Sequence, residues 1–302
     1  MTFTKLCLLA SLLLTLATPI VAKSSACKQA DALNQRAFTL HQQKAPTTQL
    51  KDLLKQALQM CPKHAQANNN LADILTEEGQ YSQAINHYQI ATAQNLPQAW
   101  YGLGEAYYKI GQFPLSLEAH LHTCTIDKDS KKRVKQLLEN NNYAITSDDK
   151  ILNKESLLSL YDPKHRAKIE QMLGVCGLRA KLIHVIAFRN LKFKSGTDKL
   201  KAISLKQLQK LAIILKLVQP NTIKVSGHTD KQRWRGKSRA ESDKLNLKLS
   251  KRRAKAVKQK LANQGIAPQR IQTQGYGSTK PMVEGNSKTA YEKNRRVEVE
   301  AK

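Results

Sequence analysis

The chain has 302 residues, of which 41% are hydrophobic, 5% aromatic and 24% charged, and its formal net charge is +27. Glycine (13) and proline (9) are scarce, so the composition is that of a helix-rich globular chain and excludes a low-complexity or collagen-like protein. The length is sufficient for two modest domains, or for one domain and a repeat array.

Residues 1–22 have the layout of a secretory signal peptide. Lys5 forms a short positive region, an apolar run extends from Leu6 to Val21, and small residues allow cleavage after Ala22 or Ala26. The run is short for a membrane-spanning helix, which needs about 20 residues. Cleavage is therefore favoured over a retained membrane anchor. No later segment is apolar enough to span a membrane, so no transmembrane span is expected in the mature chain.

Export would place the cysteines in an oxidising compartment. Once Cys7 has left with the signal peptide, the chain keeps Cys27, Cys61, Cys124 and Cys176, which allow three pairings. A Cys27–Cys61 disulfide is attractive because the two residues lie near opposite ends of an expected helix pair, and buried free thiols are the alternative. None of the four has CxxC or CxxH spacing, so we expect neither a metal site nor a cofactor.

A helical pattern repeats along residues 27–140. The tetrapeptide at 78–81 (EGQY) recurs at 110–113 (IGQF), an offset of 32 residues. Trp100 to Tyr107 reproduces the W-x2-L-G-x2-Y spacing of a tetratricopeptide repeat. The stretch therefore resembles a tetratricopeptide array of about three repeats, and the polar residues 128–140 are expected to form its capping helix.

Arrays of this kind are interaction scaffolds whose concave face holds a peptide or a partner protein. Trp100, Tyr101 and Tyr108 are candidates for ligand contacts. The helical spacing of Trp100 and Tyr107 favours a place in the core for these two, and both interpretations of Tyr108 stay open.

Residues 141–182 form a connector, to which we assign no function. One helix is expected in it, from Lys164 to about Leu173, after a turn at residues 161–163.

From residue 183 to the end, strands and helices alternate, which predicts an α/β domain. Strands are expected at about 182–188, 222–226, 270–273 and 297–299, with one helix over about 203–218 and a second ending near Gly265. This part is strongly basic: from Arg189 onward there are 29 Lys or Arg against 8 Asp or Glu, a net of +21.

Four motifs follow one another in this domain. They are Gly227-His228-Thr229-Asp230 behind a buried strand, Asn246 with Leu249-Ser250-Lys251-Arg252-Arg253-Ala254 on a helix, Gly275-Tyr276-Gly277 in a loop, and Asn294-Arg295-Arg296 before the last strand. In this order they resemble the OmpA-like peptidoglycan-binding domain, over residues 183–302. The resemblance implies a βαβαββ sandwich with a mixed sheet behind the helical tetratricopeptide solenoid, and binding to peptidoglycan without catalysis.

The ligand that the resemblance implies is the diaminopimelate of the peptide stem, which is a zwitterion. Its ammonium needs a carboxylate and its carboxylate is best held by a guanidinium. By their places in the motifs, Asp230 and Arg253 match these two roles. Asn246 and Thr229 are expected beside them, and Arg296 in a structural or supporting place. The start of the helix is expected beneath the ligand's carboxylate, and a plain Asp230–Arg253 salt bridge is the structural alternative.

One segment departs from the family's pattern. Residues 231–244, between Asp230 and Asn246, are more numerous than the family usually has, and they are basic and contain Trp234. Such a loop either contacts glycan or anionic wall polymers or is simply solvated. Its length also leaves the place of Asn246 open.

Together these features predict a periplasmic, wall-associated protein, with or without contact to the outer membrane, whose repeats recruit an unidentified protein. The alternative is an envelope scaffold whose basic C-terminal domain binds anionic wall or lipid polymers without a specific pocket.

An enzyme is not expected, because His228 beside Asp230 has no nucleophile motif near it. Nucleic-acid binding rests on charge alone and conflicts with export. A porin is excluded because ten-residue alternating strands do not recur.

Overall fold

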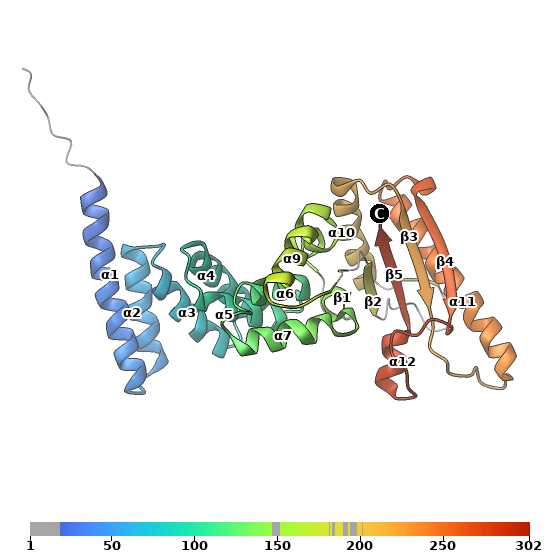
Figure 1. The fold of residues 1–302 in the computed structure, drawn as a ribbon, viewed down its shortest axis with the longest axis horizontal. Coiled ribbons are helices and arrows are strands. Elements are labelled where there is room, and N and C mark those ends of the chain that lie inside the picture. Colours follow the sequence, from blue (N-terminus) through green and yellow to red (C-terminus); the bar gives the residue numbers. More distant parts are fainter. Residues whose placement is uncertain are drawn as a thin grey trace, which may run out of the picture.

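The computed structural model describes residues 19–146, 152–180, 182, 185–189, 193, 198–200 and 202–302. Figure 1 shows a row of helices that leads into a domain built on a β-sheet. The predicted signal peptide lies mostly outside the described residues. Within the described part of the chain, no helix combines the length and the apolar character that crossing a membrane requires.

The helical part begins with three helix pairs. They are α1 (Pro19–Gln42) with α2 (Thr47–Met60), α3 (Ala65–Glu77) with α4 (Tyr81–Ala93), and α5 (Gln98–Lys109) with α6 (Phe113–Leu121). Gly79 and Gly111, which stand at equivalent places in the repeated tetrapeptide, have φ angles of 74° and 76°. The left-handed region is open to glycine without steric penalty, so the 32-residue repeat in the sequence is a repeat of the same turn between paired helices.

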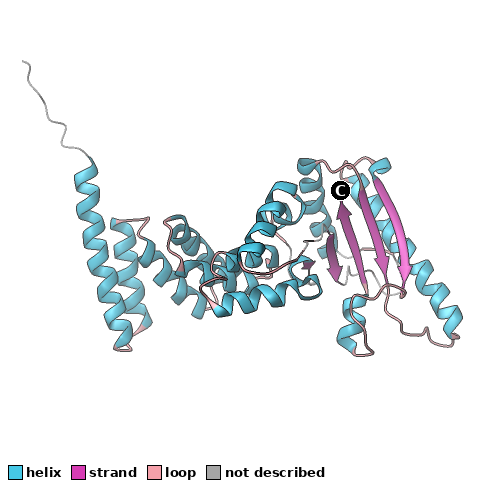
Figure 2. Ribbon diagram, viewed as in Figure 1, coloured by secondary structure: helices cyan, strands magenta, loops and turns pink. Residues whose placement is uncertain are grey.

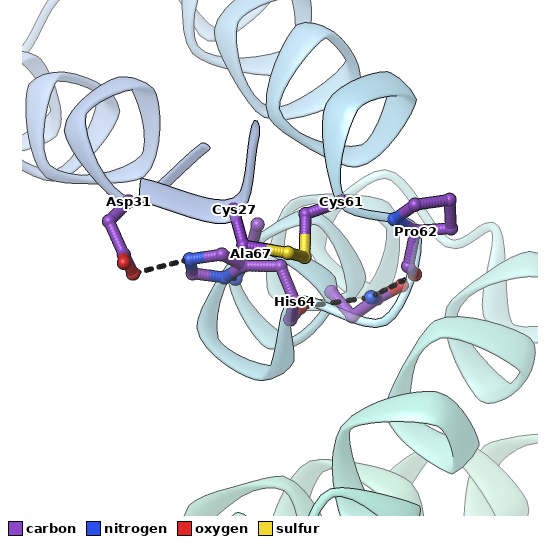
Figure 3. The surroundings of a disulfide bond; sticks show 7 residues. Cys27, Asp31, Cys61, Pro62, His64 and Ala67 are labelled. Carbon is purple, nitrogen blue, oxygen red and sulfur yellow. Dashed lines mark hydrogen bonds and ion pairs between the residues drawn. A yellow bond between two sulfur atoms is a disulfide. The ribbon is translucent and has the colours of Figure 1, made fainter. Parts of the chain in front are cut away.

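The predicted disulfide between Cys27 and Cys61 is present and fastens α1 to the end of α2, with 5.0 Å between the two Cα atoms (Figure 3). Beside it, the ring of His64 lies 2.7 Å from Asp31 Oδ1 through Nε2, and its Nδ1 accepts a hydrogen bond from Ala67 N at the start of α3. The first three helices are thus joined at one end by a covalent bond and by one buried histidine.

A second disulfide joins Cys124 to Cys176, whose Cα atoms are 5.7 Å apart. It links the loop after α6 to the end of α9 (Pro163–Val175). The expected helix over 164–173 is therefore present, but the connector also contains a 3-10 turn at Glu139–Ala144, the short strand β1 (Ile145–Thr146) and an unforeseen helix, α8 (Lys154–Tyr161).

The connector is packed on both sides. Gln112 Oε1, from the turn before α6, accepts hydrogen bonds from Asn153 N at 2.8 Å and Ser156 Oγ at 2.9 Å. At its other end Tyr161 donates a 2.7 Å hydrogen bond to the carbonyl of Val299 in the sheet. The helix expected as a polar cap, α7 (Lys128–Leu138), buries Val134 and Leu137 in the core that continues into the sheet. The last repeat helix, α6, and α7 therefore share a hydrophobic core with the connector and the sheet, whereas α1 to α5 pack around a core of their own.

The sheet has five strands in the order β1-β2-β5-β3-β4 (Figure 2). The remaining strands are β2 (Val185–Arg189), β3 (Ile223–His228), β4 (Ile271–Gly277) and β5 (Arg296–Ala301), and the helices are α10 (Ala202–Val218), α11 (Arg239–Asn263) and α12 (Lys288–Asn294), with a 3-10 turn at Pro268–Arg270. β3 and β4 are parallel, whereas β5 runs antiparallel to both β2 and β3. The predicted fold class, a helical array followed by an α/β domain with a mixed sheet, is confirmed. The connector adds β1 to the edge of that sheet, parallel to β2.

Glu118 on α6 connects the helical array to α9. Its carboxylate lies 2.9 Å from His165 Nε2 and accepts a 3.0 Å hydrogen bond from Lys168 Nζ. Burial by itself would raise the pKa of Glu118, but the hydrogen bonds and positive charges of His165 and Lys168 outweigh it and lower this pKa to about 2. The same carboxylate raises the pKa of His165.

We expect the stability that this ion pair contributes to depend on pH. Because the pKa of Glu118 falls from 4.5 to about 2 on folding, its contribution is complete above pH 4.5 and is lost as the pH falls through about 2. The raised pKa of His165 gives a contribution that is complete below pH 6.5 and is lost as the pH rises through the folded value. Glu118→Gln should therefore lower the free energy of unfolding most, by about 2 kcal/mol, between these limits.

Urea unfolding of the two proteins at about pH 3, 5.5 and 8 checks this window. The exposed Glu155 on α8 supplies the control, since Glu155→Gln removes one carboxylate from the same region without breaking this pair. Equal losses from Glu118→Gln and Glu155→Gln at pH 5.5 would contradict the assignment.

Candidate functional site

Thr229 and Asp230 lie where β3 ends, and both are buried, with 4% and 8% of their surface exposed. β3 is buried along nearly its whole length, with Ile223 and Val225 fully inside the core. An acidic residue directly behind such a strand is held at a fixed place by the sheet. Thr229 N donates to the carbonyl of Gly277 at the end of β4, which continues the parallel ladder one step beyond the strand.

The two carboxylate oxygens of Asp230 have different partners. Oδ2 accepts a 2.6 Å hydrogen bond from Arg295 Nη1, and Oδ1 accepts one from Gln232 N at 3.0 Å. The carboxylate is thus held between the loop that follows it and the residue before β5. Asp230 is ion-paired with Arg295, and not with Arg253, so the plain Asp230–Arg253 salt bridge is absent from the described structure.

Arg253 on α11 enters the same pocket from the other side. Its guanidinium lies over the ring of Phe193, 4.7 Å from the ring centre, and its Nε is buried without a hydrogen-bond partner among the described residues. Burial lowers the pKa of Arg253 to about 10, the charges of Arg295 and Arg252 add to this, and Asp230 opposes it. Arg253 remains protonated at neutral pH, as a half-buried cation that forms no ion pair in the described part of the chain.

Asn246 and Trp234 complete the wall of the pocket. Asn246 Nδ2 donates to the carbonyl of Asp230 at 3.4 Å, and its Oδ1 accepts a 2.9 Å hydrogen bond from the indole Nε1 of Trp234. Thr229 Oγ1 is buried without a partner among the described residues. The pocket has a volume of about 320 Å³ and is lined by Thr229, Asp230, Gln232, Arg233, Trp234, Asn246, Leu249, Arg253 and Arg295. Four of the five predicted ligand-binding residues therefore lie together.

The fifth, Arg296, lies elsewhere. Its Nε donates to Glu298 Oε1 at 2.6 Å, and its other nitrogens face the carbonyls of Asn294 and Lys280. Arg296 begins β5, and Arg295 directly precedes it. Successive side chains of an extended chain point to opposite sides, so only one of the two arginines can face the pocket. We did not expect Arg295 at the site, although the adjacent pair in the sequence already indicated that its members would face apart.

The basic segment 231–244 is only partly a loop. α11 begins at Arg239 with a capping box, in which Ser238 Oγ accepts from Glu241 N and Glu241 Oε2 accepts from Ser238 N. The start of this helix is therefore about 10 Å along its axis from Asn246 and about 20 Å from Arg253. The expectation that the helix start lies beneath the ligand's carboxylate does not fit α11, because the helix begins about two turns before Asn246 and about four turns before Arg253.

The remaining loop, residues 231–238, is held against the pocket. Trp234 N donates to Ser242 Oγ at 3.0 Å, and Arg239 Nη1 donates to the carbonyl of Lys231 at 3.1 Å. These contacts, and the hydrogen bond between Trp234 and Asn246, indicate that the loop is a structured wall of the pocket and not a segment that is simply solvated.

Two parts of the chain, the helical array and the C-terminal domain, match models of known protein families. Residues 192–295 match the model of the OmpA family, and residues 53–86 and 72–111 match models of the tetratricopeptide repeat. A peptidoglycan-associated lipoprotein of Buchnera aphidicola is 40% identical over 30% of this chain and 48% of its own length. Outer membrane porin F of Pseudomonas fluorescens is 34% identical over 36% of this chain and 31% of its own.

Among solved structures, the peptidoglycan-associated lipoprotein from Burkholderia pseudomallei is 25% identical, with a TM-score of 0.31, and the match covers 36% of this chain and 86% of that one. The chain spans less than half the length of the two curated relatives described above.

Proposed function

We propose, since this chain carries an OmpA-like domain behind tetratricopeptide repeats, that it is a non-catalytic protein of the cell envelope that anchors to peptidoglycan. In this proposal the C-terminal pocket holds a diaminopimelate residue of the peptide stem, and the repeats are a scaffold for another protein. The observation that carries the proposal is Arg253, a half-buried and protonated guanidinium whose Nε has no acceptor among the described residues, in one pocket with the carboxylate of Asp230.

The chemistry of the pocket is that of a zwitterion site. Arg253 offers free donors to a carboxylate, and hydrogen bonds between charged groups are about twice as strong as neutral ones. Asp230 offers its carboxylate to an ammonium, while Arg295 holds it in place in the free protein. The side chain of diaminopimelate presents both an ammonium and a carboxylate on one carbon, so that a single ligand satisfies both groups. The unpaired Thr229 Oγ1 can accept from the ammonium or donate to the carboxylate.

The predicted signal peptide and the names of the relatives support a place in the envelope. The relatives are named as peptidoglycan-associated and outer membrane proteins. On this basis we place the mature chain in the periplasm, at the wall, with the anchoring domain on peptidoglycan and the repeats turned to a partner.

Co-sedimentation with isolated peptidoglycan sacculi tests this function. The purified chain should sediment with sacculi, and about 0.5 M salt should weaken the binding only in part. Salt screens the surface charges, but it screens the charge pair inside the pocket much less. Release of most of the protein by salt alone, with equal binding to any anionic polymer, would favour the alternative of a basic scaffold without a specific pocket.

The absence of catalysis is tested on the same material. The sacculi should release no soluble muropeptides after prolonged incubation with the protein, as measured by chromatography of the supernatant. Accumulation of muropeptides with the wild-type chain would contradict a non-catalytic anchor and indicate a hydrolase.

Trp234→Phe is expected to weaken sacculus binding about fivefold. The phenyl ring keeps the apolar wall but removes the indole N–H that holds Asn246 Oδ1, and a hydrogen bond of this kind is worth about 1 kcal/mol. Titration of sacculi at constant protein concentration measures the change. Trp100→Phe, in the helical array where Trp100 stacks on His122, should leave the affinity unchanged.

A further inference from the structure

The helical array contains a second pocket, of about 660 Å³, which the proposed wall anchor does not use. We call it the repeat groove. Its walls come from the first helix of each pair, α1, α3 and α5, and the buried Leu50, Leu54 and Tyr88 contribute from the second helices. Gly102 on α5 is required here, because the ring of Tyr88 lies where a Cβ atom would stand.

Two aromatic side chains are exposed in the repeat groove. Phe38 on α1 has 47% of its surface exposed and Tyr101 on α5 has 37%. Phe38 is on the helix that the Cys27–Cys61 disulfide fastens to the array. Exposed apolar surface that gathers in one concavity, with polar groups around it, is the usual mark of a binding surface.

The charge of the repeat groove is opposite to that of the chain. The whole chain has 50 Lys or Arg and 23 Asp or Glu, yet the described residues of the groove include Asp73, Glu77 and Glu105 against one lysine, Lys109, and one histidine, His41. Glu105 is compensated by Arg133, whose Nε lies 2.8 Å from its carboxylate. Asp73 and Glu77 are different: in the described part of the chain, neither has a Lys or Arg within ion-pair distance.

Asp73 and Glu77 stand one helical turn apart on α3. Like charges at this spacing repel each other. Tyr88 donates a 2.6 Å hydrogen bond to Asp73 Oδ1, and Asn69 Nδ2 donates to Oδ2 at 2.9 Å, which fixes the carboxylate at the groove. Desolvation by the walls raises the pKa of Asp73 despite these bonds, and the charge of Glu77 adds to the shift, which His41 opposes only in part. A cation brought by a partner would relieve both effects.

We propose that the repeat groove binds a segment of another envelope protein in which a Lys or Arg stands beside a large apolar side chain. The cation would lie on Asp73 and Glu77, and the apolar side chain between Phe38 and Tyr101. This inference rests on the proposed role of the repeats as a scaffold and is independent of the wall-binding pocket.

Selection from a random dodecapeptide library, displayed to the immobilised full chain with its disulfides intact, tests the proposal. We expect the retained peptides to be enriched at least threefold in Lys or Arg next to Leu, Ile, Phe, Tyr or Trp, and depleted in Asp and Glu. The double variant Asp73→Asn, Glu77→Gln should lose the enrichment in basic residues and bind the best peptide at least tenfold more weakly. Phe38→Ala should lose the apolar preference instead.

The control is Asp52→Asn with Glu284→Gln, which removes two exposed carboxylates outside the groove and should select the same peptides as wild type. Circular dichroism of each variant establishes that it is folded, and Glu77→Gln alone repeats the test if the double variant is not. Peptides without basic enrichment, no retained peptides, or the same selection by the double variant would overturn the proposal.

Two further measurements distinguish between the competing explanations. Light scattering should give the same molecular mass for the wild-type chain and the double variant. A wild-type dimer that the double variant lacks would mean that the basic domain of a second copy occupies the groove, contrary to the proposal. The double variant should still sediment with sacculi as wild type does. If the wild-type chain selects the expected peptides but does not bind sacculi, the anchoring function is contradicted and the groove proposal stands.

Discussion

Asp230→Asn is expected to reduce sacculus binding at least 30-fold. The substitution keeps the shape of the side chain and its acceptor for Gln232 N, but among the described residues that line the pocket it removes the one carboxylate and leaves Arg253 and Arg295 without a counter-charge from them. Loss of one partner of a buried, hydrogen-bonded charge pair costs about 2–5 kcal/mol, and 2 kcal/mol corresponds to about 30-fold. Titration of sacculi at constant, moderate salt measures the change.

Arg253→Ala should have a comparable effect for the opposite reason, because it removes the free guanidinium and leaves Asp230 and Arg295 as a closed pair. The controls match each charge. Asp243→Ala removes an exposed acidic residue from α11, and Lys248→Ala removes an exposed basic residue from it, and neither residue lines the pocket. Equal losses from Lys248→Ala and Arg253→Ala would assign the binding to overall charge and contradict a specific pocket.

Gly227→Ala is expected to lower the free energy of unfolding by about 2–3 kcal/mol, as overpacking of a tight contact does. Gly227 lies in β3 directly against α11, and a Cβ atom there would overlap the backbone carbonyl oxygen of Ser250. A backbone atom of a packed helix cannot rotate away as the end of a side chain can, so β3 and α11 must separate. Chemical denaturation under oxidising conditions measures the loss.

The same contact sets the width of the pocket. Asp230 follows Gly227 by three residues and Arg253 follows Ser250 by three, so the separation of these two backbones determines the separation of the two charged groups. Gly227→Ala should therefore weaken sacculus binding even under conditions where the variant is fully folded. Gly174→Ala in α9, where a Cβ atom would have open space, should be neutral or stabilising by up to about 1 kcal/mol. A neutral Gly227→Ala would contradict the close approach of β3 and α11.

Several features could be read from the sequence because their causes are local. The 32-residue repeat of Gly79 and Gly111 is set by a turn that needs a left-handed residue, and the helix that ends before Pro220 is set by apolar spacing and a breaker. The Cys27–Cys61 pair follows from its place at the ends of one helix pair. Asp230 and Arg253 were found as members of motifs, and the structure places both in one pocket.

Other features depend on contacts between segments far apart in the chain. The packed connector follows from Gln112, Tyr161 and the Cys124–Cys176 disulfide, whose partners are 40 or more residues away and leave no periodic signal. The start of α11 inside the basic insertion is local by contrast, since Ser238 and Glu241 have the spacing of a capping box, which marks a helix start in the sequence itself.

The pocket shows the same division between sequence and tertiary structure. The sequence by itself determined which residues carry the charges, because each charge belongs to a motif on its own strand or helix. Only the tertiary structure decided that Arg295 holds Asp230, that Arg296 turns away to Glu298, and that Arg253 Nε has no hydrogen-bond partner among the described residues. The reason is geometric: an ion pair needs two atoms within about 4 Å, and the packing of β3, α11 and β5 against one another sets those distances.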